Sequence, residues 1–274
     1  MATTHNIAPS LLLQPGTQKM TYCLAIATDS GLVFVSDSRT NAGVDMVSTY
    51  SKMYEFGIPG QKQFTVLTSG NLATSQSVIN HIKKDIKKSS NHNILTMEHM
   101  TEVAEYLGEI STAEQEKTDP SVNARSYFLI GGQILDHKPA VYMVYPQGNY
   151  ISTSADTTYL QIGESKYGKP ILDRILTPDV SLETAAMCAL VSMDSTIRSN
   201  LSVGPPIELS IYPRDSLASG KYYRFEEDSE YLRQLKRNWD QSLKDSFKKL
   251  PPVAWSATWD KETEAIGSSR ESSS

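Results

Sequence analysis

The sequence predicts an α+β fold in which two β-sheets pack face to face and helices cover both outer surfaces, giving a four-layer αββα sandwich. Blocks of strand-like segments alternate with pairs of amphipathic helices along the chain, which is the pattern of such layers. A doubly wound parallel sheet would need single strands and helices to alternate, with a Gly-rich loop after the first strand, and the sequence has neither feature. The 274 residues, 39% of them hydrophobic, can form one large domain with appendages as readily as two domains.

Short apolar and β-branched runs bounded by turn residues mark the expected strands. They lie at residues 21–28, 32–37, 63–69, 126–130, 140–145, 150–154, 158–162 and 207–212. Asp29-Ser30-Gly31 separates the first two runs and predicts a hairpin, because these residue types suit tight turns. Asn41-Ala42-Gly43 marks the turn of a second hairpin-like segment, and Gly148-Asn149 marks a later turn.

Apolar residues that recur every three or four positions predict five helices. The helices are expected near residues 72–88, from residue 100, at 165–176, from Ser181 and at 229–249. The residues expected to face the core are Leu72, Ile79, Ile82 and Ile86 in the first helix, Met100, Val103, Leu107 and Ile110 in the second, and Leu232, Leu235, Trp239 and Phe247 in the last. Ser181 is a residue type that caps helix N-termini, and Pro251-Pro252 ends the last helix.

The chain is expected to have three parts. Residues 1–20 are polar, contain two prolines and lack periodicity, so they are interpreted as a leader or a mis-assigned start. Residues 21–250 form the predicted domain, and residues 251–274 form a serine-rich tail that we expect to be largely disordered. No apolar run is long enough for a signal peptide or a membrane span, which favours the cytoplasm.

Charge and cysteine content argue against several classes of function. The net charge is −5, with acidic and basic residues interspersed, so nucleic acid is not an expected partner. Cys23 and Cys188 are too few for a disulfide framework, and no Cys/His cluster suggests zinc. We therefore expect neither a metal nor an organic cofactor. The signatures GxSxG, HExxH, the Walker loop and GxGxxG are also absent from the sequence.

One block of sequence points to chemistry. Met20-Thr21 stands directly before a strand and is followed by Ser36-Asp37-Ser38-Arg39-Thr40, then Lys52, then Thr68-Ser69-Gly70-Asn71. In this order the block resembles a proteasome-type β-subunit of the N-terminal-nucleophile hydrolase superfamily, and the chain is most similar to the bacterial proteasome-related ancestral β-subunit family (Anbu). The resemblance runs from Met20 to the last long helix. Its most specific stretches are residues 36–44, 69–78 and 198–206.

The resemblance implies that Thr21 is a nucleophile once everything before it is absent. A threonine hydroxyl needs a base, and a free α-amine, which titrates near ~8, can serve directly or through one water. Lys52 would keep the local potential positive and lower the pKa of the amine and the hydroxyl, while Asp37 would hold Lys52 charged. The backbone N–H of Gly70 would stabilise the oxyanion that forms during attack.

Two further regions complete the implied site. Gly163-Glu164-Ser165 resembles a glycine-serine corner of the family, so Ser165 is expected to contact the amine of the nucleophile. Asn200 stands where proteasome β-subunits carry an aspartate that orients the amine, with Ser202 close by. Asparagine can accept a hydrogen bond but carries no charge, so this position departs from the family pattern.

Each of these residues also has a purely structural interpretation. Taken singly, they are an ordinary strand threonine, a turn-capping aspartate, a surface lysine, a strand-ending glycine and a helix-capping serine: Thr21, Asp37, Lys52, Gly70 and Ser165. The functional interpretation prevails because the residues occur together in the required order. Cys23 is a rival nucleophile, but the role of a small buried apolar residue suits it better.

Residues 1–19 decide whether Thr21 can act. Either they are a propeptide that proteolysis removes, or translation starts at Met20 and methionine aminopeptidase exposes Thr21. We favour the second, because proteasome-type autolysis prefers a glycine before the threonine. The Gly16-Thr17 pair offers that glycine, but no strand follows it directly. A chain that keeps these residues would have an acylated and therefore inactive base.

The implied function is that of a proteasome-like threonine peptidase or amidohydrolase. It would act on a peptide or peptide-like substrate and assemble with like subunits into a ring or spiral homo-oligomer, in which the long last helix could mediate subunit contacts. Two alternatives stay open: a dedicated small-peptide amidase or amide transferase with the same Thr21 chemistry, and a non-catalytic assembly subunit. The sequence does not reveal whether an ATPase partner delivers the substrate.

Overall fold

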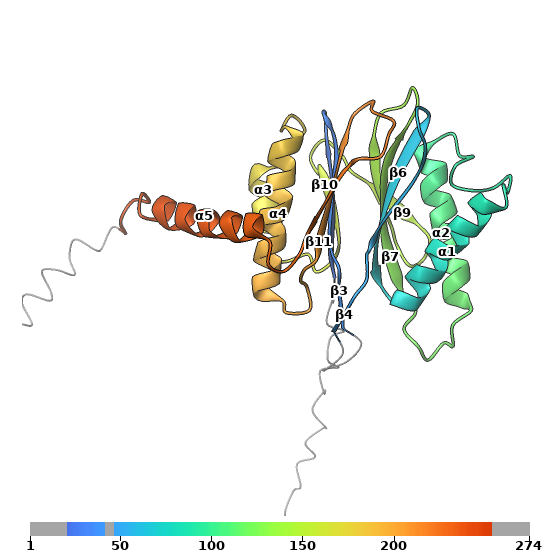
Figure 1. Cartoon of the computed structure of the whole chain (residues 1–274), viewed down its shortest axis with the longest axis horizontal. Coiled ribbons are helices and arrows are strands. Elements are labelled where there is room, and N and C mark those ends of the chain that lie inside the picture. The colour runs from blue at the N-terminus through green and yellow to red at the C-terminus, as the bar shows by residue number, and fades with distance from the viewer. Residues whose placement is uncertain (1–20, 42–46, 254–274) are drawn as a thin grey trace, which may run out of the picture. The chain divides into compact units, whose positions relative to one another are not determined.

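The computed structural model describes residues 21–41 and 47–253, and it confirms the predicted sandwich. Two antiparallel five-stranded sheets lie face to face, with two helices on the outer side of each sheet (Figure 1). The chain divides into two compact units between Ser229 and Glu230, inside the predicted 21–250 domain. The sandwich belongs to the first unit. The expected leader at 1–20 lies outside the described residues, as does the tail beyond residue 253.

The first sheet has the strand order β10-β1-β2-β11-β12, with every neighbouring pair antiparallel. Its strands are β1 Tyr22–Thr28, β2 Gly31–Asp37, β10 Tyr159–Gly163, β11 Ile207–Pro213 and β12 Lys221–Phe225. The predicted hairpin joins β1 to β2, with Thr28 paired to Gly31. Strand β12 was not predicted, because it is an edge strand of five largely exposed residues and lacks the apolar pattern of a core strand.

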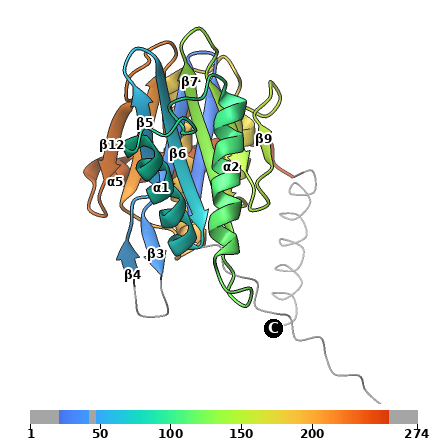
Figure 2. The same cartoon turned by 90° about the vertical axis from the view of Figure 1, so that its right-hand side faces the viewer.

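The second sheet has the order β5-β6-β7-β8-β9, so its strands follow the chain. They are β5 Met53–Ile58, β6 Lys62–Gly70, β7 Ser126–Ile134, β8 Ala140–Val144 and β9 Tyr150–Ser152. A separate two-stranded ribbon pairs β3 (Arg39–Asn41) with β4 (Val47–Thr49) (Figure 2). This ribbon is the second predicted hairpin, although residues 42–46 of its turn lie outside the described part of the chain.

Helices α1 (Leu72–Lys87) and α2 (Met100–Glu116) pack on the second sheet, and α4 (Leu182–Ser199) packs on the first, with α3 (Lys169–Ile175) against α4 (Figure 1). Each of α1 and α4 begins at a side-chain cap. The Asn71 side chain accepts a hydrogen bond from the backbone N–H of Thr74, and Ser181 accepts one from Thr184, as predicted for Ser181.

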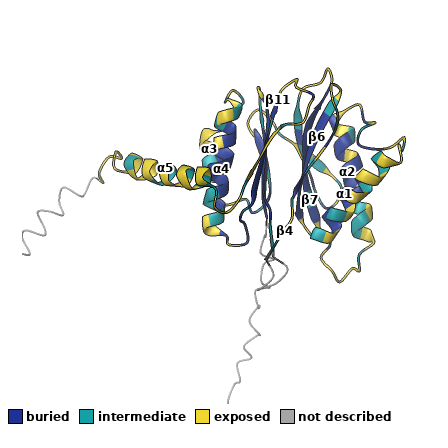
Figure 3. Ribbon diagram, in the orientation of Figure 1, coloured by how far each residue is buried: buried dark blue, intermediate teal, exposed yellow. Residues whose placement is uncertain are grey.

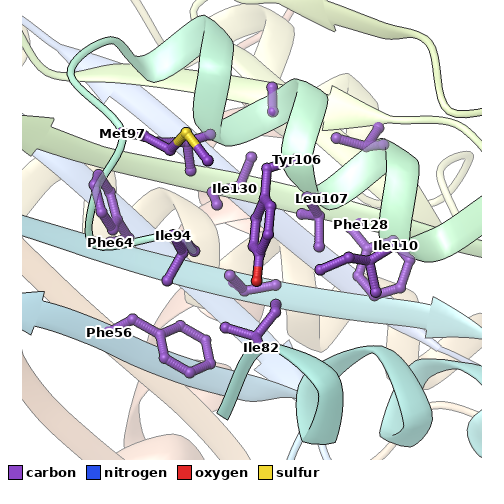
Figure 4. Packing of buried hydrophobic residues seen from close by; sticks show 14 of the residues in the cluster. Phe56, Phe64, Ile82, Ile94, Met97, Tyr106, Leu107, Ile110, Phe128 and Ile130 are labelled. Carbon is purple, nitrogen blue, oxygen red and sulfur yellow. The ribbon is translucent and has the colours of Figure 1, made fainter. Parts of the chain in front are cut away.

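Two apolar layers hold the sandwich together. One lies between the second sheet and its helices, and Figure 4 shows Phe64, Ile82, Tyr106, Leu107 and Phe128 from four different elements meeting there. The predicted core face of α2 is confirmed, because Met100, Val103, Leu107 and Ile110 are all buried. The other layer fills the space between the sheets and includes Cys23, Phe34, Leu67, Leu129 and Ile162, in the dark blue centre of Figure 3. Full burial of one such large side chain contributes about 1.5–3 kcal/mol.

Helix α3 begins later than the sequence predicts. The expected start near Ser165 was wrong, because the helix starts at Lys169 with Gly168 as its N-cap and a proline in its first turn. The segment before it is held in a non-helical path by Glu164, whose side chain accepts hydrogen bonds from the N–H groups of Ser165 and Lys166. Ser165 is therefore not the N-cap of this helix.

Helix α5 (Glu230–Phe247) belongs to the second unit. Its predicted inward residues are not buried: Leu232, Leu235 and Trp239 are half-buried, and Phe247 is 75% exposed. That prediction was wrong because the periodicity of a helix shows which residues share a face but not whether anything covers that face. Among the described residues, no helix is both long and apolar enough to cross a membrane.

Candidate active site

The ends of five strands meet at the site, and four of them carry predicted site residues. Thr21 directly precedes β1, Asp37 ends β2, Lys52 directly precedes β5, and Gly70 ends β6. The fifth end belongs to β10, whose last residue, Gly163, pairs with Tyr22. A site built on strand ends is positioned by the sheets themselves, because the register of each strand is fixed by its buried face.

A buried ion pair forms the centre of the site. Lys52 Nζ lies 2.7 Å from Asp37 Oδ1, and the two residues are only 5% and 0% exposed. The ammonium also donates to the carbonyl oxygen of Arg39 at 2.7 Å. Burial raises the pKa of the Asp37 carboxyl, and the Lys52 ammonium is the main interaction that opposes the rise. Removal of either partner would leave an uncompensated buried charge.

The same Asp37 oxygen holds the backbone at the proposed nucleophile. Asp37 Oδ1 accepts a hydrogen bond from the N–H of Tyr22 at 3.0 Å. On the other side of that peptide, the Thr21 carbonyl oxygen accepts one from the N–H of Glu164 at 2.7 Å. The Thr21–Tyr22 peptide is therefore fixed through both its N–H and its C=O, and Thr21 itself is 7% exposed.

Gly163 allows the chain to approach Thr21 this closely. Its φ is +81°, which disfavours any residue with a Cβ. A Cβ built at this position would also overlap the carbonyl oxygen of Thr21. Glycine at the end of β10 thus satisfies both the conformation and the space that the site requires.

Gly70 ends β6 with φ +102°. Asn71 N–H donates to Arg125 O toward β7 at 3.0 Å, whereas Thr68 N–H donates to Lys52 O on the opposite side at 3.0 Å. Backbone groups of successive residues in an antiparallel strand point to alternate sides. The N–H of Gly70 therefore points to the Lys52 side, where the β5–β6 pairing has already ended at Met53 and Leu67.

The predicted residues Asn200 and Ser202 lie together at the end of α4. Both are buried, at 8% and 5% exposure. Asn200 Oδ1 accepts a hydrogen bond from the N–H of Ser202 at 3.0 Å, and Asn200 Nδ2 donates to Glu164 Oε2 at 3.3 Å. Ser165 contributes its backbone N–H, which donates to Glu164 Oε1 at 2.9 Å. Contact of the Ser165 side chain with the amine stays a prediction.

Glu164 is one of two buried glutamates at the site that the sequence did not predict. It is 8% exposed and connects the carbonyl of Thr21, through its own N–H, with the amide of Asn200, through its side chain. The available signal was its place in the sequence, because an acidic residue between Gly163 and Ser165 directly follows a predicted apolar strand.

Two of the three most specific stretches of sequence, residues 36–44 and 198–206, contact each other at this site. Arg39 Nη1 donates to the carbonyl oxygen of Leu201 at 2.9 Å. The N–H of Gly204 donates to Asp37 Oδ2 at 3.4 Å, and a Cβ at Gly204 would overlap the Arg39 guanidinium. The loop after α4 is thereby connected to the end of β2.

A second buried glutamate, Glu208 on β11, contacts the backbone and side chains next to Lys52 and was also not predicted from the sequence. Its carboxylate is 2% exposed. It accepts hydrogen bonds from the hydroxyls of Ser38, Ser51 and Tyr222 at 3.1, 2.9 and 2.6 Å, and from the N–H of Lys52 at 3.4 Å. These contacts fix the backbone from which the Lys52 side chain extends.

Comparison with known proteins identifies the family. Residues 18–212 match the proteasome subunit family. The chain is 43% identical to a solved structure of Anbu (ancestral β-subunit) from Yersinia bercovieri, over 85% of this chain and 98% of that one, with a TM-score of 0.82. The chain belongs to the Anbu branch of the proteasome subunit family.

Two further relatives of this Anbu chain agree with the assignment. A Pseudomonas aeruginosa structure, described as a helical assembly of the Anbu complex, is 46% identical over 86% of this chain and all of that one, with a TM-score of 0.82. A proteasome subunit beta from Haloquadratum walsbyi is 23% identical over 219 residues, which cover 77% of this chain and 81% of that protein.

The thiol of Cys23 in this Anbu chain is poorly placed for nucleophilic attack. It is fully buried and lies 3.5 Å from the Thr68 carbonyl oxygen. Burial raises its pKa well above the ordinary value, so the thiol is protonated at neutral pH. Among the described residues, no group of three or more His, Cys, Asp or Glu side chains is arranged to hold a metal ion.

Proposed function

We propose that this Anbu-family chain is a threonine-type peptidase or amidohydrolase in which Thr21, as the first residue of the mature chain, is the nucleophile. One observation carries the proposal. A single oxygen of Asp37 contacts both the Lys52 ammonium, at 2.7 Å, and the N–H that follows Thr21, at 3.0 Å. A buried cation is thereby held beside the residue whose hydroxyl must be activated.

The reaction would proceed in two halves. The Thr21 hydroxyl attacks the amide carbonyl of the substrate while its proton passes to the Thr21 α-amine, directly or through water. The intermediate then collapses, the leaving amine takes that proton, and an ester on Thr21 remains. Water, activated by the same α-amine, hydrolyses the ester and releases the acid product.

Three neighbours would assist these steps. The positive charge of Lys52 favours the neutral form of the amine and the deprotonated form of the hydroxyl. Asp37 keeps that charge in place by the 2.7 Å contact. The Gly70 N–H, which points to the Lys52 side, would donate to the oxyanion of the intermediate.

We further propose that the chain acts on peptides or peptide-like molecules as part of an assembly of like subunits in the cytoplasm. The assembly is supported by the Pseudomonas aeruginosa relative, which is described as a helical assembly. The cytoplasm is supported by Cys23 and Cys188, which are both free.

The test begins with the N-terminus. The protein is purified from its native host, its intact mass and N-terminal sequence are determined, and peptide substrates are screened with product detection by mass spectrometry. We expect a chain that begins at Thr21 and hydrolyses amides. Thr21→Ala should abolish the hydrolysis, whereas Thr21→Ser, which keeps a hydroxyl and an amine, should retain a measurable part. Equal activity of Thr21→Ala and the unmodified protein would contradict the proposal.

A further inference from the structure

A buried carboxylate, Glu164, lies beside Thr21 directly after the end of β10. Glu164 follows the pair of Tyr22 with Gly163, so it lies opposite Thr21 in the continued register. Its N–H donates to Thr21 O at 2.7 Å. Asp37 from β2 and Lys52 before β5 neutralise each other at 2.7 Å. The buried carboxylate of Glu208 on β11 lies behind Lys52, where it accepts a hydrogen bond from the Lys52 N–H at 3.4 Å. Within residues 21–41 and 47–253, Glu164 forms no ion pair with a lysine or arginine.

The hydrogen bonds of Glu164 fix the orientation of Asn200. Glu164 Oε1 accepts from the N–H groups of Ser165 and Lys166 at 2.9 and 3.0 Å. Glu164 Oε2 accepts from Asn200 Nδ2 at 3.3 Å, and Asn200 Oδ1 accepts from the N–H of Ser202 at 3.0 Å. Both carboxylate oxygens thus face donors, and the amide must present its nitrogen to Glu164 and its oxygen to the loop.

We propose that Glu164 is a positioning residue for Thr21, and that Glu164 and Asn200 act as one unit whose negative charge resides on Glu164. This inference rests on the proposed function, because it concerns the amine of a mature Thr21. The Glu164 N–H binds the Thr21 carbonyl oxygen, and the Glu164 side chain binds Asn200 at the end of α4, so the unit connects Thr21 with the end of that helix. The charge of Glu164, which pairs with no lysine or arginine in the described part of the chain, stabilises the ammonium form of the amine against the opposing effect of Lys52.

The hydrogen-bond pattern predicts that the charge can be exchanged within the unit. In Glu164→Gln, the side-chain oxygen of the new glutamine must accept the hydrogen bonds from the N–H groups of Ser165 and Lys166. Its Nε2 then faces Asn200 Nδ2, so that two donors oppose each other. In Asn200→Asp, two carboxylates meet, acceptor to acceptor. In the double variant Glu164→Gln/Asn200→Asp, Nε2 of the new glutamine donates to the new aspartate. The hydrogen bonds from the N–H groups of Ser165, Lys166 and Ser202 are retained, and the charge moves from position 164 to position 200.

The experiment compares these three variants with the unmodified protein, each carrying the N-terminus that the host cell generates. The rate at which an amine-specific acylating reagent modifies the α-amine is followed against pH, and mass spectrometry of the N-terminal peptide gives the pKa of the Thr21 amine. Amide hydrolysis is measured over the same pH range. Glu114→Gln serves as a matched control, since this carboxyl is also largely buried but lies on α2 beside His81 and Lys117.

We expect Glu164→Gln to lower the pKa of the amine by about 1 unit, because a nearby negative charge is lost, and to reduce hydrolysis at least ~10-fold. Asn200→Asp should reduce hydrolysis by a similar factor. The double variant should restore both the pKa and most of the activity, and Glu114→Gln should change neither.

Two results overturn the inference while leaving the proposed function intact. One is an unchanged amine pKa in Glu164→Gln, which would show a structural role only. The other is a double variant no better than the worse single variant. By contrast, a mature chain that does not begin at Thr21 would refute the proposed function itself, and the inference with it.

Discussion

The Thr21–Tyr22 peptide is held by two polar pairs of different kinds. On its N–H side lies the ion pair of Asp37 and Lys52, in which two full charges are 2.7 Å apart. On its C=O side lies the pair of Glu164 and Asn200, in which one charge meets a neutral amide at 3.3 Å. Both pairs are almost completely removed from water.

The difference teaches what each pair depends on. The ion pair depends on opposite charge, so neither member can be neutralised without leaving the other charge buried and unpaired. The charge–amide pair depends on the direction of its hydrogen bond. The carboxylate can therefore move from position 164 to position 200, provided that a donor on one residue still faces an acceptor on the other. The first pair should therefore be the less tolerant of substitution.

The largest effect is expected when the ion pair is broken by Lys52→Met. The buried Asp37 carboxylate then loses its cation, and the free energy of unfolding should fall by about 3–5 kcal/mol, with loss of hydrolysis. Lys117→Met is the matched control, because Lys117 pairs with Glu114 at 2.6 Å but its side chain is 62% exposed. The control should cost less than ~1 kcal/mol. Urea unfolding measures both, and similar losses in the two variants would contradict the comparison.

The next effect concerns the backbone contact on the Glu164 side. Gly163→Ala would place a methyl group against the Thr21 carbonyl oxygen, whereas Gly60, at a similar φ of +76°, has nothing within 4 Å of an added Cβ. In both alanine variants the left-handed backbone conformation is destabilising, but only in Gly163→Ala does the added methyl group also overlap other atoms. It should lose about 1–3 kcal/mol more than Gly60→Ala in thermal unfolding, and it alone should lose activity. Equal losses would show that the close approach does not matter.

A pH effect should sharpen the contrast between the pairs. Burial already raises the pKa of Asp37, and loss of the opposing ammonium in Lys52→Met should raise it further. Because the pKa of Asp37 is higher in the folded state than in the unfolded state, the folded state binds a proton on Asp37 more tightly. The stabilisation from this proton is complete below the unfolded pKa and is lost as pH rises through the folded pKa. The difference in the free energy of unfolding between the unmodified protein and Lys52→Met should therefore shrink by about 1 kcal/mol or more when the pH is lowered from about 8 to about 5. A deficit independent of pH would contradict this account of Asp37.

The smallest effect is expected at the cysteines. Burial raises the pKa of Cys23 well above its ordinary value and that of Cys188 to about 11, so both thiols should be protonated and inaccessible at pH ~8. An aromatic disulfide reagent should find no rapidly reacting thiol in the native protein and two after denaturation. Cys23→Ala should retain hydrolysis. Rapid native labelling of Cys23, with loss of activity, would revive it as a rival nucleophile.

The fold could be predicted from the sequence, and so could four residues of the proposed site. The order of strand and helix blocks predicted the sandwich, and the resemblance of the block from Met20 to Asn71 to a proteasome-type β-subunit singled out Thr21, Asp37, Lys52 and Gly70. The structure places each of these four residues at the end of a strand or directly before one. The place of Glu164 directly after a predicted strand was the only local signal. Its contacts arise from the β1–β10 register and from the loop after α4, which join distant parts of the chain and cannot be read from a local pattern.

The other differences have similar physical causes. Glu208 was missed because its hydroxyl partners come from β2, the segment before β5 and β12, which only the folded sheet brings together. The start of α3 was predicted too early, because the Glu164 side chain accepts hydrogen bonds from the N–H groups of Ser165 and Lys166 and holds this segment as a loop, and the helix starts only at Lys169. The burial of Phe247 was misjudged because a local apolar pattern carries no information on what covers it.

The most direct test of the central claim is to trap the acyl intermediate. The protein purified from its native host is treated with a peptidyl electrophile that acylates nucleophilic hydroxyl groups, and peptide mapping by mass spectrometry locates the adduct. The account predicts one adduct on the Thr21 hydroxyl, absent from Thr21→Ala and formed more slowly in Lys52→Met. An adduct on another residue, or none on a chain that begins at Thr21, would contradict it.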